Sequence, residues 1–307
     1  MSLDKIQQDL LEKVTDLHEI PAGAYNIRAN GTSAGRNTTA NIDIVTKEDK
    51  NGIDIIIKPN TKSESVHIPV ILSQSGLKET VYNDFFIGEN AVVTIIAGCG
   101  IHNGGSEKSE HSGIHSFHIG KNAKVKYIEK HYGSGDGNGE RVMNPQTVIE
   151  IEEGGRMEME TAQIKGVDST DRSTTAVLAD KATLVIREKL MTHGNQFAKT
   201  DFTVDLNGID CGADIVSRSV AKDNSNQIFY SCINGNNKSS GHTECDAIIM
   251  DSASVSAIPK ITANHTEASL IHEAAIGKIA GEQLIKLMTL GLTEQEAEEQ
   301  IISGFLR

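Results

Sequence analysis

The chain has 307 residues, of which 38% are hydrophobic, and carries a formal net charge of -13 at pH 7. That length and apolar content suffice for a buried core, organised as one large β domain or two ordinary ones. The acidic balance argues against a nucleic-acid partner because polyanions are bound by clustered Lys and Arg, and the lack of Trp with only 4% aromatic residues disfavours carbohydrate or single-strand binding by stacking.

The first segment is predicted to be an amphipathic helix over residues 3–18. Pro21 ends the pattern, and apolar residues recur at helical spacing with charges between them at Leu3, Ile6, Leu10, Leu11, Val14 and Leu17. We expect residues 1–30 to form an N-terminal helical cap. The stretch from Asn30 to Asn41 is rich in Gly, Ser, Thr and Asn, and is predicted to be a loop.

A repeated pattern of strand, turn and strand follows the loop. It recurs in five segments, and equivalent positions are spaced by 32, 32, 27 and 31 residues at Gly88, Gly120, Glu152, Ala179 and Asp210. A period of this length with no intervening helix indicates a stacked β-solenoid, in which neighbouring turns bury each other's inward residues. We therefore predict an all-β fold with a right-handed parallel β-helix core over residues 31–275. The alternative, a β-sandwich, would need more two-residue turns of the Asn-Gly type.

A first group of metal-binding residue types lies around one of these repeats. Cys99, His102, His111, His115 and His118 fall within 20 residues, in Cys-x-x-His and His-x-x-x-His-x-x-His spacings. Such spacings are compatible with a zinc or iron site. The alternative is a polar loop with incidental histidines, because the segment is rich in Gly and Ser. If the metal interpretation holds, the chain could be a metalloenzyme that uses this group.

A second group lies nearer the C-terminus. Cys245 precedes the contiguous pair His272 and Glu273 by 27 residues, which matches the shorter repeat spacing, so the cysteine and the pair could lie on neighbouring turns. Thiolate, imidazole and carboxylate can jointly hold iron. Successive strand residues face opposite sides, so His272 and Glu273 cannot both point at Cys245 unless the strand ends or bulges there. The alternative is a buried packing cysteine and a surface His-Glu pair.

The last segment, residues 276–307, is predicted to be helical. Gly291 supplies a left-handed stop after a first helix, and Thr293 with Glu296 forms a capping box that begins a second one. These helices carry more apolar residues than are needed to cover one end of the solenoid. The residues concerned are Leu284, Leu287, Met288, Ile301, Ile302 and Phe305.

The last 65 or so residues form a specific signature. The run 268–284, followed by 290–294 and 301–305, closely resembles the C-terminal signature of the SufB/SufD family, and Glu244-Cys245-Asp246 is similar to the segment that carries the essential cysteine of SufB. Members of this family are scaffold subunits for iron-sulfur cluster assembly. The resemblance implies that His272 falls on the histidine shared by SufB and SufD, and Glu273 on a SufB glutamate. It also implies that the C-terminal helical segment docks the ATPase partner, SufC.

The resemblance predicts a scaffold rather than an enzyme, with ATP hydrolysis in a separate SufC-like partner. The chain lacks the long N-terminal region of typical SufB proteins and combines the SufB-like Cys and Glu with the His used by SufD, which suits a homodimer in place of a SufB-SufD heterodimer. One chain offers too few ligands to close a cluster, and a two-fold dimer doubles the set for a transient one. The sulfur donor, the cluster type and the use of a flavin stay open. The alternative that the chain is an architectural adaptor, which binds the ATPase but no metal, also stays open.

Cysteine usage and hydropathy predict the compartment. The four cysteines form no short-spaced pair, the N-terminus has no apolar signal segment, and no stretch approaches 18 uncharged apolar residues. We therefore expect a cytoplasmic protein with no membrane span.

Overall fold

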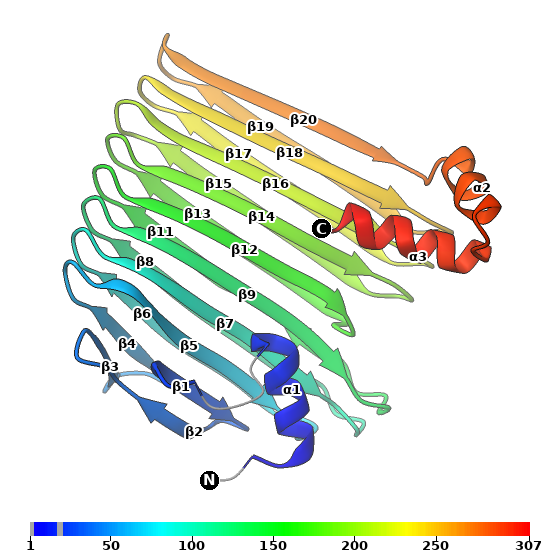
Figure 1. Ribbon diagram of the computed structural model, residues 1–307, viewed down its shortest axis with the longest axis horizontal. Coiled ribbons are helices and arrows are strands. Elements are labelled where there is room, and N and C mark those ends of the chain that lie inside the picture. The colour runs from blue at the N-terminus through cyan, green and yellow to red at the C-terminus, as the bar shows by residue number, and fades with distance from the viewer. Residues whose placement is uncertain (1–2, 17–20) are drawn as a thin grey trace.

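The computed structural model describes residues 3–16 and 21–307. Strands account for 59% of the structure and form a parallel β-solenoid of about 8 turns, which confirms the predicted fold. Each turn contributes one strand to each of two facing sheets, here named sheet A and sheet B (Figure 1). Turns stack because the strands of a single turn cannot bury their inward side chains alone.

From residue 52 to residue 277 the chain adds strands to sheet B and sheet A in alternation, with two short consecutive strands of sheet B at residues 141–151. In spatial order sheet A contains β2 (Thr32–Asn37), β1 (Ala24–Ala29), β5 (Lys62–Leu72), β7 (Val92–His102), β9 (Lys124–Ser134), β12 (Arg156–Lys165), β14 (Thr183–Thr192), β16 (Cys211–Ala221), β18 (Ser239–Ile249) and β20 (Ala268–Gly277). Sheet B contains β19 (Ser254–Ala263), β17 (Asn226–Gly235), β15 (Phe197–Leu206), β13 (Ser169–Leu178), β10 (Arg141–Met143) with β11 (Gln146–Ile151), β8 (Ser109–Ile119), β6 (Lys78–Ile87), β4 (Gly52–Ile57) and β3 (Ile42–Thr46).

The corner between sheet B and sheet A repeats one turn conformation. Each of five successive corners places a residue at positive φ, namely Asn90, Asn122, Gly154, Lys181 and Asp210. Gly, Asn and Asp tolerate the left-handed region better than other residues, which explains four of the five. These corners are the tight turns that the sequence repeat predicted.

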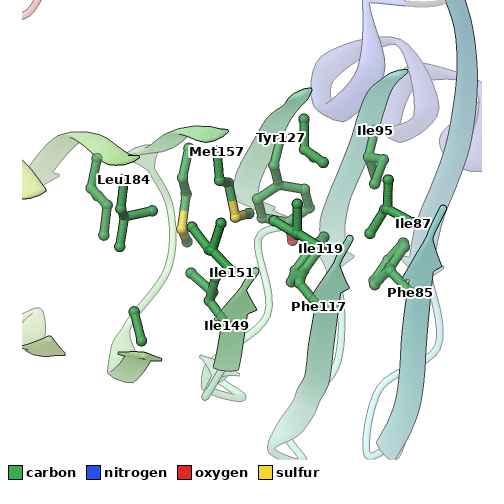
Figure 2. Packing of buried hydrophobic residues seen from close by; sticks show 14 of the residues in the cluster. Phe85, Ile87, Ile95, Phe117, Ile119, Tyr127, Ile149, Ile151, Met157 and Leu184 are labelled. Carbon is green, nitrogen blue, oxygen red and sulfur yellow. The ribbon is translucent and has the colours of Figure 1, made fainter. Parts of the chain in front are cut away.

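Inward side chains at alternate strand positions form the core. Phe85 of β6 stacks on Phe117 of β8 with ring centroids 4.4 Å apart, and Tyr127 of β9 meets Phe117 edge-on at 4.9 Å. Figure 2 shows these rings together with Met157 of β12 and Ile149 of β11, which come from both sheets. The same alternation puts every second residue on the outer faces, so one strand can serve two surfaces.

Helix α1 (Lys5–Thr15) lies on the outer face of sheet A against β5, β7 and β9 (Figure 1). The predicted helix is confirmed, except that Leu17 lies outside the described residues. Gly98 and Gly100 of β7 let the helix approach closely, since a Cβ there would stand about 3 Å from atoms of Val14 and Leu10. The strands β2 and β3, each antiparallel to its neighbour, form the first edges of the two sheets. Strand β1 pairs in parallel with β5 and belongs to the solenoid, although we expected residues 1–30 to cap it. The predicted loop over 30–41 is wrong for β2, which lies within that stretch.

Helices α2 (Gly281–Thr289) and α3 (Glu294–Phe305) follow β20 directly and confirm the predicted helical tail. The capping box between Thr293 and Glu296 is present. Helix α3 turns back along sheet A, where Ile302 and Leu306 pack against Val220 of β16 (Figure 1). Because α3 covers the face of sheet A and pairs with no strand, β19 and β20 remain the last strands of their sheets. Among the described residues no helix is long and apolar enough to cross a membrane.

Candidate functional site

Cys245 lies on the inner face of β18, one strand from the edge of sheet A. Its side chain is 1% exposed and belongs to the main core cluster. In register it stands between Ser217 of β16 and Ala274 of β20. Burial raises the pKa of the Cys245 thiol to about 12, and the negative charge of Glu188 adds to this. The thiol is therefore protonated and shielded in this conformation.

Polar side chains lead through the interior toward Cys245. Glu188 of β14 is the register neighbour of Ser217 and accepts hydrogen bonds from Ser217 Oγ at 2.6 Å and Thr200 Oγ1 at 2.9 Å. On its other side Arg172 of β13 lies between Glu188 and Glu129, with Nε 3.9 Å from Glu188 Oε1. Buried charges are tolerated where they are paired. This row of paired side chains ends at Ser217, whose register neighbour is Cys245.

His272 and Glu273 occupy opposite faces of β20. His272 pairs in register with Thr243 and lies on the inner face, as Cys245 does, while Glu273 pairs with Glu244 on the outer face. The register between β18 and β20 contains no bulge, so the alternation is unbroken. The structure thus brings His272 and Cys245 to one face and places Glu273 on the other. Burial lowers the pKa of His272 and favours the neutral imidazole.

The outer face of the same strand pair gathers Glu273 with two further potential ligands. His242, Glu244 and Glu273 each offer one atom within 4.8 Å of the others. His242 Nδ1 lies 2.8 Å from Asp214 Oδ1, and this hydrogen bond raises the pKa of His242. A hydrogen bond with the neighbouring carboxyl of Asp246, together with burial, raises the pKa of Glu244.

The five residues of the other predicted metal site are divided between interior and surface. Cys99, His111 and His115 point inward and are buried, whereas His102 and His118 point outward. His102 Nδ1 lies 3.1 Å from Ser134 Oγ, and His118 Nδ1 lies 2.9 Å from Glu150 Oε2. These five residues therefore do not share one site.

The three inward residues line a small internal cavity with Glu129 and His131 of β9. Its volume is about 10 Å³, enough for at most about one water molecule. Cys99 is the register neighbour of His131, and burial raises the pKa of the Cys99 thiol well above its usual value. Burial alone would raise the pKa of Glu129, but Arg172 holds it well below the usual range. The cavity contains a packed ionic network rather than an open ligand set.

The predicted docking residues of the tail differ in exposure. Ile302 of α3 is buried against Val220, and Leu284, Leu287, Ile301 and Phe305 are half-buried. Met288 is 42% exposed, and two residues that the sequence did not single out are more so, Ile285 at 63% and Leu290 at 76%.

From the sequence alone we gave no role to Asp214 and named Glu244 only as part of the motif around Cys245. The signal was present in the alternation, because residues 242 and 244 must face away from an inward Cys245. It could not show that Asp214 and Glu273 lie beside them, since that depends on the register between three turns.

Comparisons with known proteins identify the family of the chain. The family model described as SUF system FeS cluster assembly, SufBD core domain, matches residues 73–305. The chain is 31% identical over 255 residues to an iron-sulfur cluster assembly SufBD family protein of Methanocaldococcus jannaschii, covering 82% of this chain and 79% of the relative. For SufBD family proteins of Archaeoglobus fulgidus and Pyrococcus horikoshii, identity is 31% over 263 residues and 27% over 278 residues, covering 84% and 89% of this chain and 69% and 83% of the relatives. The chain therefore belongs to the SufBD family of the iron-sulfur cluster assembly system.

Proposed function

We propose that this protein is a scaffold on which an iron-sulfur cluster is assembled transiently at Cys245. The observation that carries the proposal is the position of Cys245 beside the last strand of sheet A, with the neutral imidazole of His272 on the same inner face. A thiolate and an imidazole are both ligands for iron-sulfur clusters, and a small number of protein ligands leaves the cluster labile enough to be passed on.

A second copy of the chain would complete the ligand set. Strands β19 and β20 end their sheets, and within the described part of the chain nothing pairs with their outer edges. Such edges favour pairing with another strand. Ile258, Ile261 and Ile271 on these two strands are each more than 40% exposed, so a homodimer would bury apolar surface there as well. Each Cys245 would then lie one strand away from the shared edge, on the same inner face of the joined sheet as its His272.

The C-terminal helices support docking of a SufC-like ATPase. Helix α2 exposes Ile285 and Met288, with Leu290 immediately after it, and exposed apolar patches of this kind mark interaction sites. Residues 278–280 alone connect β20 to α2. A partner that moves α2 during ATP hydrolysis would therefore pull on the strand that covers Cys245, and opening of β20 would expose the thiol.

Anaerobic reconstitution with ferrous iron and sulfide tests the proposal. Wild-type protein should develop visible absorption of a cluster, and Cys245→Ser should lose most of it. Cys211→Ser is the matched control because Cys211 is also a buried cysteine of the same core cluster, and this variant should keep the absorption. Equal absorption in all three proteins would reject Cys245 as the assembly site, and no cluster absorption in any of them would favour an adaptor that binds the ATPase but no metal.

A further inference from the structure

The outer face of sheet A carries metal-binding side chains that cluster assembly at Cys245 does not use. His242 and Glu244 project from β18 and Glu273 from β20, and one ligand atom of each lies within 4.8 Å of the others. Within residues 3–16 and 21–307, no other group of three His, Cys, Asp or Glu side chains meets this separation. An imidazole nitrogen with two carboxylates is a common kind of ligand set for divalent first-row metals.

The imidazole of His242 is held in the orientation that metal binding requires. Its Nδ1 lies 2.8 Å from Asp214 Oδ1, and its Nε2 lies 3.5 Å from Glu273 Oε2. Asp214 is itself held by Arg187, whose Nη2 lies 2.5 Å from Oδ2. When Nδ1-H donates to Asp214 and Nε2 carries no proton, the lone pair of Nε2 is free for a metal ion beside Glu273. Metal-binding histidines usually donate their other N-H group to a carboxylate in this way.

The two glutamates would repel each other without a cation between them. Glu244 and Glu273 are direct register partners, and like charges at such positions destabilise a sheet. Arg218 and, when protonated, His242 lie close enough to Glu244 to offset part of this repulsion. The adjoining cavity, about 520 Å³ in volume, is lined by His242, Glu244 and Arg218 among others, so a hydrated ion has a route to the ligands.

We propose that His242, Glu244 and Glu273 form a binding site for a divalent first-row metal ion, with Asp214 as the positioning residue. For its role the inference rests on the proposed function: the ion is ferrous iron, held on the face of sheet A opposite Cys245 before it joins sulfur. Glu273 belongs to β20, whereas His242 and Glu244 belong to β18. Displacement of β20 therefore removes one of the three ligands and uncovers Cys245 in the same movement.

Binding of ferrous iron alone tests the site. Anaerobic equilibrium dialysis without sulfide, in excess Mg²⁺, should show one ion per chain for the wild type. His242→Ala and Glu244→Gln should weaken binding at least tenfold, and Asp214→Asn about tenfold, the loss typical of a positioning carboxylate. His118→Ala is the matched control, because His118 is also an outward histidine beside a carboxylate, Glu150, and it should bind as the wild type does. Circular dichroism confirms that each variant folds.

Visible spectra with Co²⁺ separate this site from the thiol. The wild type should show weak ligand-field bands that disappear in His242→Ala, with no thiolate-to-metal charge-transfer band, and Cys245→Ser should leave them unchanged. Unaltered affinity in His242→Ala and Glu244→Gln, or a charge-transfer band lost in Cys245→Ser, would overturn the proposal. If instead Cys245→Ser reconstitutes a cluster normally while His242→Ala loses the ion, the metal site stands and the proposed assembly role fails.

Discussion

Cys245 and Glu188 belong to the same inward column of sheet A, separated by Ser217 alone. The register aligns Glu188 of β14 with Ser217 of β16, and Ser217 with Cys245 of β18. The column therefore places a carboxylate two strands from the thiol in the interior, where the thiol is already deprived of solvent. Both effects favour the neutral S-H group.

Cys245 should accordingly react slowly with alkylating reagents in the isolated protein. With a pKa of about 12, roughly one thiol in 10⁵ is ionised at pH 7, and access is blocked as well. Iodoacetamide labelling followed by mass spectrometry should modify the half-buried Cys232 well before Cys245. Urea should make both cysteines reactive. Equal labelling rates in the native protein would show that the last turn is already open.

Removing the buried Arg172 should destabilise the fold strongly. Its side chain is 4% exposed and pairs with Glu129 and Glu188, so Arg172→Met leaves buried carboxylates without their partner. The expected loss is about 3–5 kcal/mol of unfolding free energy. Urea denaturation measures it. Arg156→Met is the control, since Arg156 pairs with Glu158 at the surface and its loss should cost less than about 1 kcal/mol.

Acid should destabilise the protein in part through His111. Burial, with the nearby His131 and His115, lowers the pKa of His111 to about 3 in the folded state, against about 6.5 when unfolded. Between these values the unfolded chain binds the extra proton, so stability falls as pH drops below 6.5. From pH 7 to pH 5 the loss from this group is about 2 kcal/mol.

Urea denaturation of wild type and His111→Gln at pH 8, 7 and 5 checks this. The variant removes the titrating group, so its loss of stability between pH 7 and pH 5 should be smaller than that of the wild type. Between pH 8 and pH 7 the two should change in parallel. Identical losses down to pH 5 would mean that His111 is protonated in the folded protein.

Neighbouring phenylalanines of β6 should respond very differently to truncation. Phe85 is fully buried and stacked on Phe117, so Phe85→Ala should cost about 3–5 kcal/mol through lost burial and a cavity. Phe86 is 41% exposed and stacks on His118 at the surface, so Phe86→Ala should cost less than about 1 kcal/mol. Chemical denaturation measures both, and similar costs would contradict the assignment of faces.

Exposed apolar residues after β20 should govern ATPase binding. Ile285→Ala and Leu290→Ala should each weaken binding of a SufC-like ATPase about tenfold without lowering stability, because both side chains are solvated in the free protein. Calorimetric titration with the purified ATPase measures the affinity. Ile6→Ala on α1, 42% exposed, is the control and should bind normally. Wild-type affinity in both tail variants would exclude this surface as the docking site.

Much of the fold was predictable because its determinants are local. The repeat of about 30 residues, the turn residues at each corner and the alternation of inward and outward positions all lie in contiguous segments. The capping box of Thr293 and Glu296 is equally local and was predicted correctly. The helices could not be placed in the same way, because α1 and α3 cover the outer face of sheet A through contacts with distant strands.

The sequence by itself determined the solenoid repeat, and it determined that His272 and Glu273 face opposite ways if their strand is unbroken, since both follow from the period of an extended strand. Tertiary structure alone decided which side chains share a face across turns. The lengths of the loops set the register, and a shift of one residue would have exchanged every inward and outward side chain. That register put His272 beside Thr243 on the inner face, Glu273 beside Glu244 on the outer face, and Cys99 apart from His118.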